Sequence, residues 1–104
     1  MTPEQAIFNL LGIAASARKV VSGEEQVIKE VRSNSAKLVI VSTDASDNTT
    51  KKMHDKCAYY NVPIYTFGTR EALGHATGRE SRVSLAIMDN GFAKKLSQYF
   101  NELA

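Results

Sequence analysis

One apolar run constrains the fold more than any other feature of the sequence. Residues 37–42 read Lys-Leu-Val-Ile-Val-Ser, a continuous segment that is rich in β-branched residues and bounded by turn-forming residues. A strand covered on both faces is apolar at every position, whereas a strand with one solvated face alternates apolar and polar residues. The run therefore predicts a central strand with other elements packed on both of its faces.

The rest of the chain alternates between helical and extended patterns. Apolar residues recur at three- and four-residue spacing in helices that are expected to begin at Thr2, at Ser22, after residues 44–48, at Thr69 and at Asp89. Short extended segments are expected at residues 20–21, 64–67 and 82–88. Because parallel strands need crossover connections, this alternation favours a mainly parallel sheet. We therefore predict an α/β fold, a three-layer α/β/α sandwich with a small mixed, mainly parallel central sheet.

The size and composition of the chain limit its organisation and location. Its 104 residues, 43% of them hydrophobic, can fill one core but hardly two, so residues 1–104 should form a single domain. No segment approaches the roughly 20 apolar residues that a membrane-spanning helix requires. The N-terminal residues lack the basic start and apolar core of a signal peptide, and the single Cys57 cannot form an internal disulfide. We expect a cytoplasmic protein with no membrane partner.

The sequence carries no signature of catalysis. The nucleophile-elbow, P-loop, dinucleotide-binding and zinc-protease patterns are all absent. Cys57 shares a helical face with Met53 and Tyr60, whereas His54 points about 100° away from it, so thiol and imidazole cannot act as a pair. We interpret Cys57 as a buried small hydrophobe and His75 as solvated. The sequence predicts no enzyme, no catalytic residue, no metal, no cofactor and no small-molecule substrate.

The stretch that joins the first two helices has features that suit a nucleic acid. Arg18 and Lys19 end the first helix, and Gly23 precedes the N-terminus of the second. A helix N-terminus with glycine presents free N–H groups and a partial positive charge, which attracts an anion. Glu24 and Glu25 would repel a phosphate there. If RNA binds at this turn, we therefore expect the carboxylates to accept hydrogen bonds from the edges of bases.

The same stretch also has a purely structural interpretation. Ser22 and Glu25 have the spacing of a capping box, in which the two side chains satisfy the first N–H groups of the helix. The sequence leaves both interpretations open. If RNA binds here, Lys29, one turn further along, could hold a phosphate or a base oxygen.

A polar loop before the last strand is the second candidate for a binding surface. Residues 78–82 read Gly-Arg-Glu-Ser-Arg. Guanidinium groups pair with phosphates bidentately and stack on bases, and small residues let RNA approach. Taken alone, the segment is equally compatible with an ordinary surface loop. Further lysines lie on the polar faces of helices and are interpreted as solvated: Lys51, Lys52, Lys56, Lys94 and Lys95.

Four segments carry a resemblance to a known family. They are LLGIAASARKVVSGEEQVIKEV, AKLVIVSTDAS, NVPIYTFGTREALGHATG and RVSLAIMD, which together span nearly the whole chain. The middle two are the most specific, because an Asp-containing turn after a buried strand is followed by Val-Pro and then by Leu-Gly-x-Ala-x-Gly. The sequence resembles the L7Ae ribosomal-protein family, which binds kink-turn RNA, and is most similar to its short bacterial YlxQ-like branch.

The resemblance implies how the second helix would read RNA. In that family a Gly-x-Asn-Glu-x-x-Lys motif opens this helix and reads the sheared G·A pairs of the kink-turn. The corresponding residues here are Gly23, Glu25, Gln26 and Lys29, so Gly and Lys match while Asn-Glu is replaced by Glu-Gln. One carboxylate and one carboxamide remain on adjacent residues, which keeps acceptors and donors available to guanine. The implied function is non-enzymatic recognition of kink-turn RNA with tandem sheared G·A pairs.

The resemblance also assigns the remaining site residues and the partner. It places the loop at residues 78–82 near a flipped-out nucleotide and gives Lys37 a contact with the RNA backbone. The expected partner of the monomer is structured RNA, either ribosomal or messenger leader RNA, and ribosome association stays open. The residues expected to bind it are Arg18, Lys19, Gly23, Glu24, Glu25, Gln26, Lys29, Lys37, Gly78, Arg79, Glu80, Ser81 and Arg82.

The alternative function is a protein–protein interaction module that keeps the fold but has lost specific RNA recognition. Lys and Arg outnumber Asp and Glu by only 13 to 11, and the net charge is +2. This modest charge permits a polyanion partner without requiring one. The departure from the family motif at Glu25 is the other ground for this alternative.

Overall fold

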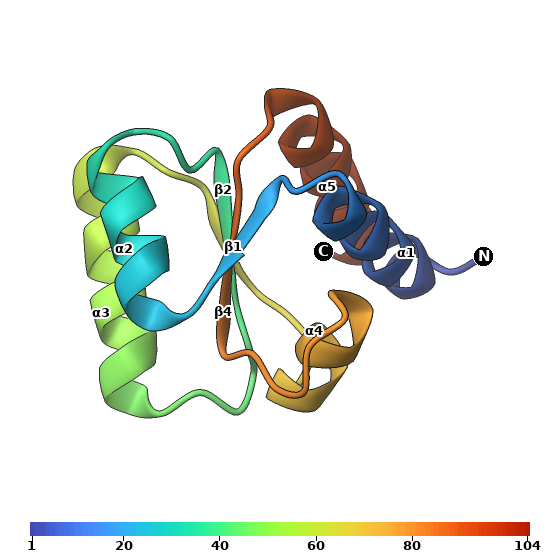
Figure 1. The fold of residues 1–104 in the computed structure, drawn as a ribbon, viewed down its shortest axis with the longest axis horizontal. Helices are drawn as coiled ribbons and strands as arrows, with labels where there is room; N and C mark the ends of the chain where they lie inside the picture. Colours follow the sequence, from blue (N-terminus) through green and yellow to red (C-terminus); the bar gives the residue numbers. More distant parts are fainter.

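A four-stranded sheet lies between two layers of helices in the computed structural model, which describes residues 1–104 (Figure 1). The elements in chain order are α1 (Pro3–Ser16), β1 (Val20–Ser22), α2 (Glu24–Arg32), β2 (Leu38–Val41), α3 (Asp47–Tyr60), β3 (Ile64–Thr66), α4 (Arg70–Ala76), β4 (Ser84–Ile87) and α5 (Asn90–Leu103). Helices α2 and α3 cover one face, and α1, α4 and α5 cover the other (Figure 1). The predicted three-layer α/β/α sandwich is confirmed. None of the helices combines the length and apolar character that crossing a membrane requires.

The sheet is mixed, with strand order β1-β4-β2-β3. β2 and β3 pair in parallel, whereas β4 pairs antiparallel with both β1 and β2. β1, β2 and β3 therefore run in one direction and are joined by the helical crossovers that the alternating pattern predicts. The predicted mixed sheet, with most strands running in one direction, is confirmed, and β4, inserted between β1 and β2, is the one strand that runs in the opposite direction.

The short connection through α4 explains this reversal. α4 has seven residues, half as many as the crossover helix α3, and at about 1.5 Å per residue it spans only about 10 Å. The chain therefore stays near the end of the sheet where β3 finishes. Arg82 N donates a hydrogen bond to Arg70 O at 2.9 Å, which holds the approach to β4 beside the start of α4.

Alternate residues of β2 fill two separate cores. Leu38 and Ile40 pack with residues of α1, α4 and α5, whereas Val39 and Val41 pack with residues of α2 and α3. All four side chains are fully buried, and burying each contributes about 1.5–3 kcal/mol. The prediction of a central strand covered on both faces is confirmed.

Most of the predicted helix starts are confirmed by their caps. Thr2 Oγ1 accepts a hydrogen bond from Gln5 N, and the Gln5 side chain accepts one from Thr2 N, which completes a capping box at α1. Side-chain oxygens likewise cap α3, α4 and α5, and they belong to Ser46, Thr69 and Asp89.

The first helix ends earlier than the sequence predicts. α1 finishes at Ser16, and Arg18 then adopts a left-handed conformation with φ of 61°. Arg18 and Lys19 therefore lie in the turn into β1 and not in the last turn of a helix.

Candidate nucleic-acid interface

Connecting segments from four strands meet at one end of the sheet. β1 and β2 end where β4 begins, since Ser22 pairs with Leu85 and Val41 pairs with Ser84. The turns after β1, β2 and β3 open α2, α3 and α4 there, and the loop before β4 joins them at the lower end in Figure 1. We call this region, formed by residues 22–26, 42–49, 67–70 and 78–84, the loop end.

The turn after β1 leaves the start of α2 open. Gly23 is the N-cap, has a φ of 98°, and no side chain caps this helix. A Cβ at this position would meet nothing within 4 Å, so the backbone conformation and not crowding calls for glycine. The first-turn N–H groups, on Glu24, Glu25 and Gln26, have no hydrogen-bond partner in the chain. They give the turn a partial positive charge.

The capping-box interpretation of Ser22 and Glu25 is wrong. Ser22 lies in β1, before the N-cap, and its Oγ accepts a hydrogen bond from Arg82 Nε at 2.8 Å. Glu25 caps nothing, and both Glu25 and Gln26 are exposed. The side chains of Glu25 and Gln26 are therefore free to bind a partner.

The loop before β4 is anchored to α4. Arg79 N donates a hydrogen bond to Gly74 O at 2.7 Å. A Cβ at Gly74 would lie only 2.6 Å from Ser81 N, so this position admits no side chain unless the loop moves. Gly78 turns the chain with a φ of 75°. The glycines of the Leu-Gly-x-Ala-x-Gly motif thus shape the loop and fix its place.

A cleft of about 510 Å³ lies between this loop and the turn after β1. Gly23 N donates to Ser84 O at 3.3 Å, which ties the two walls together, and Thr49 adds the first turn of α3 to the lining. Ser84 is also a lining residue, but its hydroxyl is buried and makes no hydrogen bond in the chain. Buried polar groups are normally paired, so this hydroxyl is an exception, but its burial keeps it out of reach of a ligand in the cleft.

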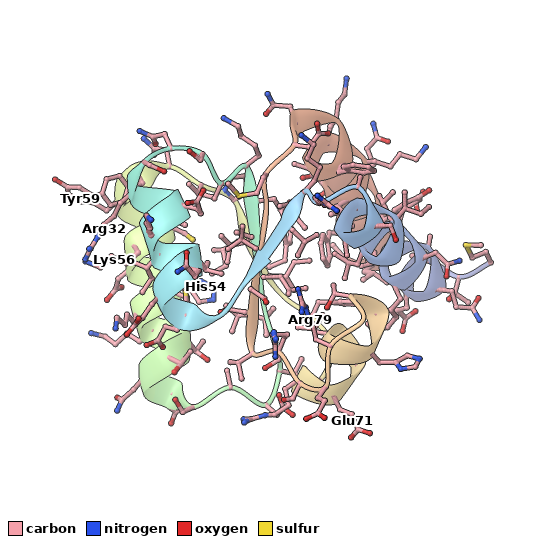
Figure 2. All side chains as sticks on the ribbon, in the orientation of Figure 1. Arg32, His54, Lys56, Tyr59, Glu71 and Arg79 are labelled. Carbon is pink, nitrogen blue, oxygen red and sulfur yellow. The ribbon has the colours of Figure 1, made fainter.

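Two guanidinium groups border the turn after β1. Arg82 binds Ser22 directly. Arg79 and Ser22 together line a small hollow of about 60 Å³, and Figure 2 shows the Arg79 side chain on the side of the loop that faces β1. The structure therefore brings together the two segments that the sequence singled out, residues 22–26 and 78–82.

Sequence reasoning missed an ion pair at the loop end. Asp44 Oδ2 lies 3.5 Å from Arg70 Nε, and Asp44 Oδ1 accepts a hydrogen bond from Arg70 N at 3.0 Å. The Ser42 hydroxyl, together with Arg70, holds the pKa of the Asp44 carboxyl below its usual range. The signal in the sequence was that each residue shortly follows a strand, and the carboxyl ends of neighbouring parallel strands coincide.

A second missed pair changes the electrostatics of the α2 start. Lys52 Nζ on α3 lies 3.3 Å from Glu24 Oε2. This cation offsets one of the two carboxylates that were expected to repel phosphate. Glu25 keeps its charge without an ion-pair partner in the chain.

The structure does not bring Arg18, Lys19 and Lys37 to the cleft. The residues that follow Lys19 and Lys37 both pair with Ile87, at the far end of β4 from the loop end. Lys37 Nζ donates a hydrogen bond to Asn34 O at 3.2 Å. These three predicted RNA contacts therefore occupy the opposite end of the sheet.

The lone thiol lies apart from this surface. Cys57 is 1% exposed in the core beneath α2 and α3. Burial raises the pKa of this thiol to about 11, so it is protonated at neutral pH. No group of three or more His, Cys, Asp and Glu side chains is placed to hold a metal ion.

The sandwich and its loop end define a small α/β binding domain, in which a rigid sheet positions an open helix start, a glycine-shaped loop and a cleft. The chain belongs to the ribosomal protein L7Ae/L30e/S12e/Gadd45 family, whose sequence profile matches residues 5–97. The family that the sequence resembles is thereby confirmed.

Individual relatives agree with this assignment. The chain is 56% identical over 89 residues to the RNA-binding protein YlxQ of Bacillus subtilis (strain 168), covering 86% of this chain and 89% of that protein. It is 42% identical over 94 residues to the RNA-binding protein YlxQ of Enterococcus faecium, covering 90% of each. A solved structure of a protein of unknown function from Bacillus halodurans has a TM-score of 0.89 at 43% identity, covering 91% of this chain and 96% of that one.

Proposed function

We propose that this protein binds kink-turn RNA through the loop end and acts without catalysis. The observation that carries the proposal is the uncapped start of α2, where free N–H groups and the exposed Glu25 and Gln26 lie beside an arginine-bearing loop. The two YlxQ relatives are named RNA-binding proteins, which supports RNA as the class of ligand.

In this proposal the start of α2 reads base edges. Sheared G·A pairs leave guanine N–H groups accessible, unlike the edges that lie deep in an A-form duplex. The Glu25 carboxylate accepts hydrogen bonds from these groups, and the Gln26 carboxamide both accepts and donates. Where the family motif has Asn-Glu, this chain has Glu-Gln, so the turn keeps one carboxylate, which only accepts hydrogen bonds, and one carboxamide, which both accepts and donates them.

Cations beside this turn hold the RNA backbone. Arg82 is fixed by its bond to Ser22, and Lys29 is exposed one turn along α2. Both bind phosphates, which adds affinity that falls with salt. Because Lys52 offsets Glu24, the backbone meets less repulsion at the α2 start than the sequence suggests.

The cleft receives a nucleotide that is flipped out of the RNA stack. Its walls carry Arg82 and the exposed Ser81, so a base finds a guanidinium plane to stack on and a hydroxyl as a hydrogen-bond partner. Arg79, at the edge of the same loop, adds a second guanidinium group. Because the bent RNA alone presents the flipped nucleotide and the G·A edges together, binding shifts the RNA population toward the bent form.

Arg18, Lys19 and Lys37 have a smaller part in this proposal. They lie at the opposite end of the sheet and reach phosphates only where an RNA stem extends beyond the cleft. Their attraction is electrostatic and independent of sequence.

The test is a titration at one fixed salt concentration against two RNAs. One is a kink-turn RNA, and the other has its tandem G·A pairs replaced by Watson–Crick pairs. Tight binding to the first and a large loss on the second supports the proposal. Weak and equal binding to both contradicts it and favours the protein-interaction alternative.

A double variant locates the site within the protein. Gln26→Ala with Lys29→Ala removes one base contact and one phosphate contact and is expected to weaken kink-turn binding by roughly 10- to 100-fold. The matched control is Gln98→Ala with Lys94→Ala, which removes exposed residues of the same types from α5. Unchanged affinity in the first double variant would remove the α2 start from the interface.

A further inference from the structure

A groove runs along the outer layer between α2 and α3, outside the cleft. It has a volume of about 460 Å³, and its floor is formed by Ile28, which is 6% exposed. One wall is a single stripe of α2, with Glu25, Lys29 and Arg32 at positions i, i+4 and i+7. Lys52 of α3 forms part of the other wall. Glu25 and Lys29 belong both to this groove and to the proposed RNA site, so the two surfaces are continuous.

The groove and its extension along α3 carry more positive than negative charge. Lys56 follows Lys52 by one turn on the same side of α3. Lys29, Arg32 and Lys56 take part in none of the ion pairs of the molecule. Of the four cations, only Lys52 is paired, with Glu24. This excess of unpaired cations suits a polyanionic strand.

An exposed aromatic ring stands at the far end of the cationic stripe. Tyr59 is 79% exposed and lies one turn beyond Lys56 on α3. Its ring is held edge-on by Tyr60, with centroids 4.8 Å apart and an interplanar angle of 76°. Figure 2 shows Arg32, Lys56 and Tyr59 projecting from the helical layer away from the sheet. A fixed, exposed ring beside cations is a platform on which an unpaired base can stack.

We propose that this groove binds a single-stranded RNA segment that continues from the site at the start of α2. Lys29, Arg32, Lys52 and Lys56 hold its phosphates, and Tyr59 stacks on one of its bases. The nine residues of α2 span about 13 Å, so the groove holds a short segment of a few nucleotides. The proposal rests on the proposed function, because the strand enters the groove from the RNA bound at the loop end.

The experiment compares a compact kink-turn RNA with the same RNA carrying a single-stranded extension of about six nucleotides, placed in turn at each end of the RNA. The wild-type protein is expected to bind one extended RNA roughly 5- to 100-fold more tightly than the compact one, the range for one stacked base. Tyr59→Ala is expected to lose most of this gain, whereas Tyr59→Phe, which keeps the ring, retains it.

The salt dependence tests the cations separately. Arg32→Ala with Lys56→Ala is expected to lower the slope of log affinity against log salt by about 1.4 for the extended RNA, since each phosphate of a single strand contributes about 0.7. The matched control is Lys94→Ala with Lys95→Ala, which removes two exposed cations from α5 in the opposite layer. All substituted side chains lie at the surface, and thermal melts show whether each variant is folded.

The outcomes separate this inference from the proposed function. Two outcomes would overturn the inference while the compact RNA still binds with G·A dependence. In the first, neither extension adds affinity. In the second, the added affinity of the extended RNA survives both in Tyr59→Ala and in Arg32→Ala with Lys56→Ala, and either result means that the groove does not bind RNA and is left to a protein partner. If the compact RNA itself fails to bind with G·A dependence, the proposed function fails first. A gain that disappears only in the groove variants establishes the second contact.

Discussion

The two ends of the sheet both carry basic residues, but they differ in how those residues are held. At the loop end, Arg82 is fixed by Ser22 and Arg70 by Asp44, each through its guanidinium group. At the opposite end, Arg18 and Lys19 are exposed in a turn. Only the loop end adds free helix N–H groups with a cleft beside them.

This difference separates attraction from recognition. An exposed surface cation attracts any phosphate, and its contribution falls with salt. Recognition needs donors and acceptors at fixed positions, which the loop end obtains from its hydrogen-bonded arginines and from Gly74. We therefore expect substitutions at the two ends to change RNA binding by very different amounts.

The largest difference is expected between Arg82→Ala and Lys37→Ala. Arg82→Ala removes a phosphate contact and the link between the loop and Ser22, and should weaken kink-turn binding by roughly 10- to 100-fold, since a hydrogen bond to a charged group contributes about 1.5–3 kcal/mol. Lys37→Ala removes a cation at the opposite end and should change affinity by less than about threefold. Titrations at one salt concentration measure both.

The folded state must be checked in each case, because Arg82 also contributes a contact within the protein. Circular dichroism melts before titration provide this control. Equal losses from both substitutions would mean that the two ends act alike and that fixed geometry has no role.

A smaller effect is expected from moving the loop without touching a polar side chain. A methyl group at Gly74 would lie 2.6 Å from Ser81 N, so Gly74→Ala should displace the loop and lower RNA affinity by about tenfold. Gly91→Ala is the matched control, since it also adds a methyl group within a helix, at 3.0 Å from the side-chain Oδ2 of Asp89, and α5 begins at the opposite end of the sheet from the loop. RNA titration of the folded variants distinguishes them, and equal affinities of the two variants would show that the loop is not part of the RNA-binding surface.

Local patterns in the sequence predicted the elements well. The continuous apolar run at β2 indicated burial on both faces, and the caps Thr2, Thr69 and Asp89 marked helix starts that the structure confirms. These features depend on residues close together in the chain, so periodicity and capping chemistry suffice to find them.

Features that depend on distant residues were not predicted. The direction of β4 follows from the short α4 connection, and the position of Lys37 away from Arg82 follows from strand register. Asp44 and Arg70 are 26 residues apart and meet only because β2 and β3 are parallel neighbours. The capping-box error at Ser22 has the same origin, because its true partner is 60 residues further along the chain.

A modest effect is expected at the acceptor that fixes Arg82. Ser22→Ala leaves the Arg82 charge in place but removes the hydroxyl that accepts from its Nε at 2.8 Å. Affinity for kink-turn RNA should fall by roughly two- to tenfold, about 0.5–1.5 kcal/mol, because the guanidinium keeps its charge and its phosphate contact and loses only its fixed position. Ser16→Ala, at the end of α1, is the control and should leave affinity unchanged. A loss as large as that of Arg82→Ala would show that positioning, and not charge, is the main contribution of Arg82.

The smallest effect concerns the pH dependence of the loop end. The pKa of Asp44 is below its ordinary value of 3.8 through the Ser42 hydroxyl and Arg70. A carboxyl whose pKa is lowered by folding stabilises the protein above its unfolded pKa, and this contribution is lost as the pH falls through the folded pKa.

Asp44→Asn tests this contribution, because it keeps an oxygen that can accept a hydrogen bond from Arg70 N but removes the charge. Urea unfolding should therefore show wild type slightly more stable than this variant at about pH 6, with the gap closing as the pH falls below 3.8 and through the folded pKa. Lys37→Ala at the opposite end, away from the Asp44–Arg70 pair, should differ from wild type by the same amount at about pH 6 and in acid. A gap for Asp44→Asn that persists unchanged in acid would show that the ionised carboxylate does not help to hold the loop end together.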